Sequence, residues 1–207
     1  MNTTIDQLRS ALAKPLPGLD AQLRMAPKPR VGWNPLNIPV NARPAAALLL
    51  LYPHNDTVNI TLTVRGSGLR NHTGQVSFPG GRVEDGETVE QAALREANEE
   101  VGIETAAVEI LGRLTPLHIP VSRYLLHPVV AFASMRPAFQ RAEWEVARII
   151  EAPLPLLLDP ATTRRELRTR VVNGQTIEVD VPFFEIDGEK VWGATAMVLA
   201  EFCALTR

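Results

Sequence analysis

Residues 88–101 constrain this chain most, because they predict one long helix with clear ends. Thr88 and Gln91 match a capping box, in which each side chain accepts a hydrogen bond from the other residue's backbone N–H. Gly102 follows at the position where a left-handed glycine ends a helix. Any fold for this chain must therefore contain a helix that starts after Thr88 and stops near Gly102.

Glutamates gather on one face of this predicted helix. Helical spacing places Glu96, Glu99 and Glu100 within roughly a third of its circumference. Ala93 and Val101 lie on the other side and can pack on a sheet. Each pair of like charges costs about 0.2–0.5 kcal/mol even when exposed, and a divalent cation removes that penalty. Carboxylates suit Mg²⁺ or Mn²⁺ better than zinc; the alternative is an acidic face in contact with water.

The sequence around the helix extends the acidic pattern. Eight positions carry it: Gly81, Glu87, Arg95, Glu96, Glu99, Glu100, Gly102 and Ile103. In this order and spacing they match the Nudix box, except that Ala97 stands where the box has a bulky aliphatic residue. Seven of these positions have a fixed residue type in the box. If each type has a frequency of about 7%, the pattern would occur by chance in such a chain only about once in a million. The chain therefore resembles Nudix hydrolases.

This resemblance implies a fold and a chemistry. Nudix hydrolases have an α/β fold, an α/β/α sandwich with a mixed β-sheet, and use Mg²⁺ or Mn²⁺ while water attacks a phosphorus of a nucleoside diphosphate derivative. Carried onto this sequence, the metal ligands are Glu96 and Glu100, with Glu99 as a third. Arg95 is expected to pair with Glu87 and fix its orientation. The catalytic residues implied are Glu96, Glu99, Arg95 and Glu87.

The general base is left open at this point. A carboxylate outside the metal shell can take the proton of the attacking water. Glu96 and Glu99 are candidates. So are Glu143 and Glu145, in a segment where some Nudix relatives supply an extra carboxylate, with a plain surface role as the alternative.

A second motif precedes the helix. It reads Leu62-Thr63-Val64-Arg65, then Arg70, Gly74 and Phe78-Pro79-Gly80-Gly81. Its spacing resembles the signature of coenzyme A pyrophosphatases, from which Thr61 and Gly66 depart. The resemblance implies a substrate, coenzyme A or an acyl derivative, that is cut into 4′-phosphopantetheine and 3′,5′-ADP.

Four residues of this motif are predicted to bind the substrate. Arg65 and Arg70 offer forked donors that suit phosphate oxygens. Gly80 and Gly81 let the backbone approach a metal or phosphate closely. The alternatives are that the arginines brace the loop and that the glycines only form a turn. His72 is as readily an incidental loop residue as a phosphate contact.

Two other functions compete with this prediction. The first is a Nudix enzyme for ADP-ribose, a dinucleotide or a modified nucleoside triphosphate, which the departures at Thr61 and Gly66 leave open. The second is a non-catalytic Nudix-fold module that senses a nucleotide or pairs with a protein. Such a module could dispense with its metal carboxylates, whereas this chain keeps all of them.

Composition limits the partners and the compartment. With 207 residues and a net charge of −2, the chain suits one domain without general attraction to nucleic acid or anionic lipid. The longest apolar run, residues 45–52, is too short to span a bilayer. One cysteine, Cys203, cannot form an internal disulfide, which fits a reducing cytoplasm. A small-molecule substrate is therefore the expected partner, and a homodimer is left open.

The chain is expected to divide into an arm, residues 1–44, and a Nudix domain, residues 45–207. The arm begins with a helix at 3–13, and its dense prolines exclude a long helix after it, so it is either ordered over the domain or partly mobile. The domain patterns predict strands at 46–52, 58–64, 108–114 and 125–133, a loop at 65–86, a turn and strand at 143–153, hairpins at Asn173-Gly174 and Asp187-Gly188, and a helix at 195–205. Trp192 is expected in the core, and the arginines of residues 163–170 on a solvated face.

Overall fold

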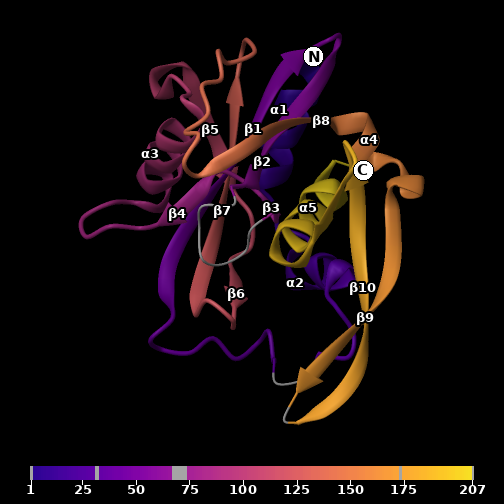
Figure 1. The fold of residues 1–207 in the computed structure, drawn as a ribbon. Coiled ribbons are helices and arrows are strands. Elements are labelled where there is room, and N and C mark those ends of the chain that lie inside the picture. Colours follow the sequence, from indigo (N-terminus) through magenta and orange to yellow (C-terminus); the bar gives the residue numbers. More distant parts are fainter. Residues whose placement is uncertain (1, 31–32, 67–73, 173, 207) are drawn as a thin grey trace.

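A mixed β-sheet forms the centre of the protein (Figure 1). The computed structural model describes residues 2–30, 33–66, 74–172 and 174–206. In these residues the sheet has eight strands: β1 (Arg43–His54), β2 (Thr57–Arg65), β3 (Val76–Ser77), β4 (Gly80–Arg82), β5 (Val108–Arg113), β6 (Leu117–Ile119), β7 (Tyr124–Ala133) and β8 (Val146–Pro153). β1 lies in the middle, parallel to β7 and antiparallel to β2 and β4. The predicted mixed sheet is confirmed.

Helices cover both faces of this sheet (Figure 1). α3 (Val89–Val101) packs on one face, while α1 (Asn2–Leu12) and α5 (Gly193–Leu205) lie on the other. Successive residues of a strand point to opposite faces. Leu48 accordingly joins the hydrophobic cluster under α3, and Leu49 joins the cluster under α5. The predicted α/β/α sandwich is therefore confirmed.

The described part of the arm is ordered against the domain. After α1 it forms α2 (Gly18–Gln22) and the short 3₁₀ helix η1 (Leu23–Met25), and both pack on α5. Glu201 of α5 is fully buried and accepts a hydrogen bond from Gln22 Nε2 at 2.8 Å. Buried carboxylates persist where hydrogen bonds satisfy them, so this contact ties the arm to the domain.

A second sheet of three antiparallel strands flanks α5. It consists of β9 (Thr163–Val172), β10 (Gln175–Ile186) and β11 (Glu189–Trp192), and it confirms both predicted hairpins. The expected core position of Trp192 is wrong, because this residue is only partly buried at the end of β11. Its indole ring lies under the guanidinium of Arg168, 4.4 Å from the ring centroid. A cation over an aromatic face is a favourable arrangement at a surface.

Several short elements were not expected from the sequence. β1 begins at Arg43, two residues before residue 45, and runs to His54. The turn between β1 and β2 therefore contains only Asn55 and Asp56, whose φ angles are 49° and 59°. Positive φ at both central residues is typical of a tight hairpin turn. β3 and β4 lie within the expected loop; β6, α4 (Leu154–Leu158), η2 (Thr105–Ala107) and η3 (Pro160–Thr162) are also new. Segments of two to five residues are too short to show periodicity.

Among the described residues, no helix combines the length and apolar character needed to cross a membrane.

Candidate active site

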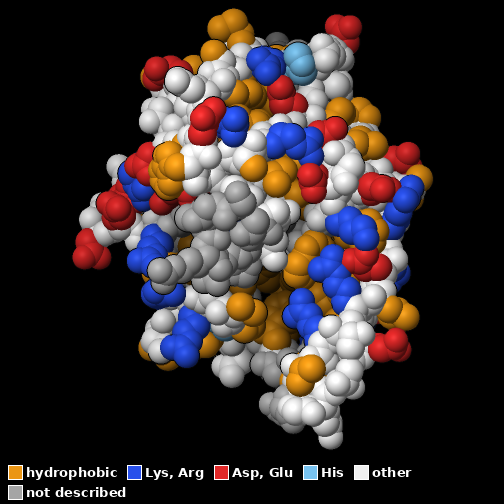
Figure 2. Space-filling view, viewed as in Figure 1, with side chains coloured by type: hydrophobic (Ala, Val, Ile, Leu, Met, Phe, Trp, Pro, Cys, Tyr) orange, Lys and Arg blue, Asp and Glu red, His pale blue; other side chains and the backbone are white. Residues whose placement is uncertain are grey.

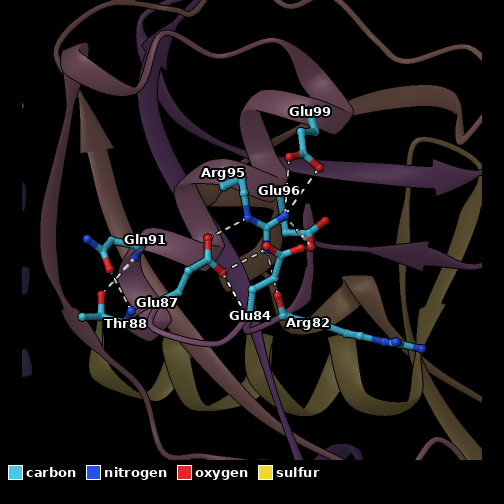
Figure 3. A network of polar contacts seen from close by, with 8 residues as sticks. All are labelled: Arg82, Glu84, Glu87, Thr88, Gln91, Arg95, Glu96 and Glu99. Carbon is cyan, nitrogen blue, oxygen red and sulfur yellow. Dashed lines mark hydrogen bonds and ion pairs between the residues drawn. The ribbon is translucent and has the colours of Figure 1, made fainter.

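Helix α3 begins and ends as its sequence predicts. Thr88 Oγ1 accepts a hydrogen bond from Gln91 N at 3.2 Å, and Gln91 Oε1 accepts one from Thr88 N at 2.8 Å (Figure 3). Gly102 ends the helix with φ at 70°. A side chain there would be strained, and its Cβ would also lie 2.9 Å from Gln140 Cβ. Both ends of the helix that carries the glutamates are therefore fixed.

Strand β4 brings two glycines against the glutamate face and the sheet. A Cβ added to Gly81 would lie 2.3 Å from Glu96 Oε1, and one added to Gly80 would lie 2.3 Å from the Ala46 carbonyl oxygen. Real side chains cannot approach backbone so closely, so position 80 requires glycine, whereas a side chain at position 81 would displace the Glu96 carboxylate. Gly81 thus lies against the Glu96 carboxylate and Gly80 against β1, while the predicted approach of these glycines to a metal or phosphate stays a prediction.

Arg95 links the acidic groups around the start of α3 (Figure 3). Its Nε donates to Glu87 Oε1 at 2.7 Å, and its Nη1 donates to Glu96 Oε1 at 3.0 Å and approaches Glu99 at 3.5 Å. Its Nη2 donates to the Arg82 carbonyl at 3.0 Å. The Arg95 guanidinium lowers the pKa of Glu87. The predicted pairing of Arg95 with Glu87 is present, and the same guanidinium also holds Glu96.

Glu100 occupies the most buried acidic position of this helix, with 5% of its surface exposed. Burial and, to a lesser degree, the nearby charge of Glu145 together raise its pKa to about 8. Gly80 N lies 3.5 Å from Glu100 Oε1, a long contact that favours the ionised form only weakly. Burial also raises the pKa of Glu96. Both carboxylates therefore lie where negative charge is poorly solvated, which is typical of functional sites.

The structure separates the two acidic candidates that precede β8. Glu145 lies beside β2, where Gly66 N donates to its carbonyl at 2.7 Å and Arg65 Nη2 lies 3.7 Å from its carboxylate. Its charge acts on both Glu96 and Glu100. The side chain of Glu143 is 82% exposed and pairs with Arg141 instead. The site thus brings together Glu96, Glu100, Glu145 and Arg65 from three separate segments.

Comparison with known proteins identifies the family. The family model of the NUDIX domain matches residues 42–149. The chain is 35% identical over 175 residues to the Nudix hydrolase NudL of Shigella flexneri serotype 5b, covering 84% of this chain and 86% of NudL. It is 37% identical over 157 residues to NudL of Escherichia coli O6:H1, covering 75% and 79%. The chain belongs to the Nudix hydrolase family.

Solved structures agree with this fold. The MutT/nudix family protein from Enterococcus faecalis matches with a TM-score of 0.50 and 16% identity, over 83% of this chain and 65% of that chain. The MutT protein from Methanosarcina mazei Go1 also gives a TM-score of 0.50 and 16% identity, over 78% and 92%. At this identity the likeness establishes the fold of this Nudix hydrolase and nothing finer.

The carboxylates of this Nudix hydrolase are chemically suited to a hard divalent cation. Their present arrangement in the described residues, however, does not form a complete metal site. Nudix enzymes use divalent ions such as Mg²⁺ or Mn²⁺, which prefer carboxylate oxygens. The charge of the partly buried Glu96 helps to raise the pKa of the buried Glu100, and Gly81 leaves the Glu96 carboxylate uncovered. Among the described residues, however, no three acidic, histidine or cysteine side chains are arranged to hold one ion. Arg95 holds Glu96 and draws Glu99, 55% exposed, to the helix surface.

Two of the substrate-binding candidates cannot be placed. Arg70 and His72 lie outside the described residues. Arg65 ends β2 next to Glu145, and its Nε is buried without a hydrogen-bond partner in the part of the chain that the structure describes. A buried guanidinium N–H without an acceptor is costly, so a partner is expected for this atom.

Proposed function

We propose that this Nudix hydrolase cuts the diphosphate bond of coenzyme A, giving 4′-phosphopantetheine and 3′,5′-ADP. The observation that carries the proposal is the motif of residues 62–81, which resembles the coenzyme A pyrophosphatase signature. Two of its segments border the glutamates of α3, since Gly81 contacts Glu96 and Arg65 lies beside Glu145. The motif residues therefore lie where a diphosphate held at these glutamates would be contacted.

Glu96 and Glu100 are the proposed metal ligands, with Glu99 as a third. A bound Mg²⁺ or Mn²⁺ neutralises phosphate oxygens and makes a bound water more acidic. Arg95 orients Glu96 through its hydrogen bond, and Glu87 in turn orients Arg95. Glu99 is held only weakly by Arg95, because its two contacts to Nη1 are both 3.5 Å long and its side chain is 55% exposed.

Glu145 is the proposed general base. It is the acidic residue of the 143–145 turn whose charge reaches Glu96 and Glu100, whereas Glu143 is directed to Arg141. A base must lie within hydrogen-bond reach of the water it deprotonates, and Glu145 lies across the site from α3. Arg65, whose Nε has no hydrogen-bond partner among the described residues, and Arg70 are proposed to bind phosphate oxygens of the diphosphate.

A product assay tests the substrate directly. Purified protein is incubated with coenzyme A, ADP-ribose or NADH, each with Mg²⁺ and with Mn²⁺, and the products are identified by mass spectrometry. We expect coenzyme A to be cleaved most efficiently, yielding both products named above. If coenzyme A stays intact while ADP-ribose or NADH is cleaved, the substrate proposal is wrong and the competing Nudix activity replaces it. Tight binding of a nucleotide without turnover in either metal would favour the non-catalytic module.

A further inference from the structure

A groove separates the N-terminal arm from the end of the central sheet. It consists of two adjoining hollows of about 450 and 420 Å³, which share Pro39, His118 and Pro120. Arg30, Trp33, Asn34 and Asn37 of the arm line the first hollow, and Arg123 of the β6–β7 turn lines the second. In Figure 1 the arm passes beneath β6, and the strand register places β4 and β6 near the start of β1 and β7.

Two side chains of this groove hold buried polar atoms that lack partners. His118 is only 8% exposed, and within the described chain neither of its ring nitrogens has a hydrogen-bond partner. The indole Nε1 of Trp33 is buried and unpaired in the same sense. Buried donors and acceptors are nearly always satisfied in folded proteins, by protein, water or ligand. Because His118 also lines both hollows, these atoms indicate a missing polar partner in the groove.

Arginines without carboxylate partners gather at the same end of the sheet. Ten arginines of the described chain form an ion pair with a carboxylate, and six form none within those residues; four of the six, Arg30, Arg43, Arg82 and Arg123, lie at this end of the sheet. Arg43 and Arg82 instead flank the Tyr124 ring, at 4.5 and 6.0 Å from its centroid, and Arg82 Nε donates to the Tyr124 hydroxyl at 2.5 Å. Figure 2 shows several blue side chains at the left of this face, near the place of β4 and the start of β1 in Figure 1. In a chain with a net charge of −2, such a cluster favours an anionic ligand.

The strand register connects this groove to the glutamates of α3. Arg82 of β4 pairs with Ala45 of β1, Ala45 pairs with Leu126 of β7, and Leu126 pairs with Leu117, the neighbour of His118. Three strand spacings of about 4.8 Å put the groove about 14 Å from Arg82. Arg82 follows Gly81, which contacts Glu96. An extended substrate whose diphosphate lies at Glu96 can therefore reach the groove with its nucleoside.

We propose that the groove between the arm and β6 binds the phosphorylated nucleoside end of the substrate. The two asparagine carboxamides and the His118 imidazole can exchange hydrogen bonds with the edge of a nucleobase, and Trp33 provides an aromatic surface. Arg30 and Arg123 provide guanidinium donors for a sugar phosphate. The assignment of this ligand as part of the substrate rests on the proposed function, whereas the groove itself does not. Arg65 and Arg70 then remain with the diphosphate.

The test measures binding of 3′,5′-ADP in metal-free buffer, so that no hydrolysis is needed. Titration calorimetry compares the wild type with Arg30→Ala and Arg123→Ala, and with Arg164→Ala as a matched control. Arg164 is an exposed arginine of β9 paired with Glu185, remote from the groove. We expect each groove variant to weaken binding at least tenfold and the control to stay within twofold of wild type. The KM for coenzyme A should rise by a similar factor in the groove variants, with kcat changed less than threefold.

A fluorescence experiment locates the ligand. Trp144→Phe and Trp192→Phe together leave Trp33 as the sole tryptophan of the chain, and 3′,5′-ADP should then change its emission with the calorimetric Kd. The proposal is overturned if wild type does not bind, if Trp33 emission stays constant while heat is released, or if the groove variants bind and hydrolyse normally. Groove binding without cleavage of coenzyme A would refute the proposed function alone. Cleavage with KM unchanged in the groove variants would refute this proposal alone.

Discussion

Glu143 and Glu145 are two residues apart, yet their surroundings differ in every respect that matters for catalysis. The sequence offered both as a general base and gave no means to choose, because the choice depends on how β8 pairs with β2. That pairing joins residues more than 80 positions apart, and it places Glu145 beside Arg65 with Gly66 bonded to its carbonyl. The Glu87–Arg95 pair, by contrast, lies within one motif, and its prediction from the sequence is confirmed by the contact at 2.7 Å.

This difference predicts opposite results for two conservative substitutions. Glu145→Gln should lower kcat for the cleaved diphosphate by about 10²–10⁴-fold, the usual contribution of a general base, with little change in melting temperature. Glu143→Gln serves as the matched control and should change kcat less than twofold, because its carboxylate is directed to solvent and Arg141. Steady-state kinetics on both variants measure the effect. Equal rates for the two variants would remove Glu145 from the mechanism.

The role of Glu100 can be measured without following the reaction. If Glu100 is a metal ligand, Mn²⁺ binds the folded protein far better than the unfolded chain and raises its melting temperature by mass action. Glu100→Gln should abolish most of this rise while the metal-free variant melts near or above the wild type, since a poorly solvated carboxylate has been removed. Glu178→Gln, an exposed glutamate of β10, is the control. A full Mn²⁺-induced shift in Glu100→Gln would contradict the assignment.

Among the helices and strands, those that are determined by interactions between residues close in sequence could be predicted from the sequence. Helix α3 was predictable because its capping box and its terminal glycine act within one turn of the chain. Strands β3, β4 and β6 were not, because two or three residues carry no periodic pattern and form strands only by pairing with β2, β1 and β7. Trp192 was misplaced for the same reason: its position under Arg168 depends on strand β9, more than 20 residues away.

The cap of α3 predicts a modest and specific loss of stability. In Thr88→Ala the backbone N–H of Gln91 loses its acceptor. The other bond of the capping box, from the backbone N–H of residue 88 to Gln91 Oε1, can still form. Loss of an N-cap hydroxyl costs about 1 kcal/mol, which corresponds to a fall of about 2–4 °C in melting temperature for a chain of this size. Thr88→Ser, which keeps the acceptor, should melt close to the wild type. Identical melting of Thr88→Ala and wild type would show that the cap contributes nothing.

For the whole molecule, the main finding is that the arm and the domain are joined through a buried polar contact. The sequence left the arm either ordered or partly mobile, since prolines limit helices but do not reveal what the chain packs against. The structure places α2 on α5, with the fully buried Glu201 accepting from Gly18 N, Gln22 Nε2 and Thr115 Oγ1. A single carboxylate thus joins the arm, the segment after β5 and the last helix.

Glu201→Ala should therefore loosen the arm as well as lower global stability. The substitution leaves several buried donors without an acceptor, and each orphaned donor costs about 1–3 kcal/mol, so urea denaturation should show a loss of about 3 kcal/mol or more. The side chains of Arg24 and Arg30 are already exposed, so partial opening of the arm should let trypsin reach the backbone at these residues under native conditions, well before the sheet is cut. Glu178→Ala, which removes an exposed carboxylate, should match the wild type in both measurements. If Glu201→Ala unfolds at the wild-type urea midpoint and its arm resists trypsin, the apolar contacts of α2 and η1 with α5 must hold the arm by themselves.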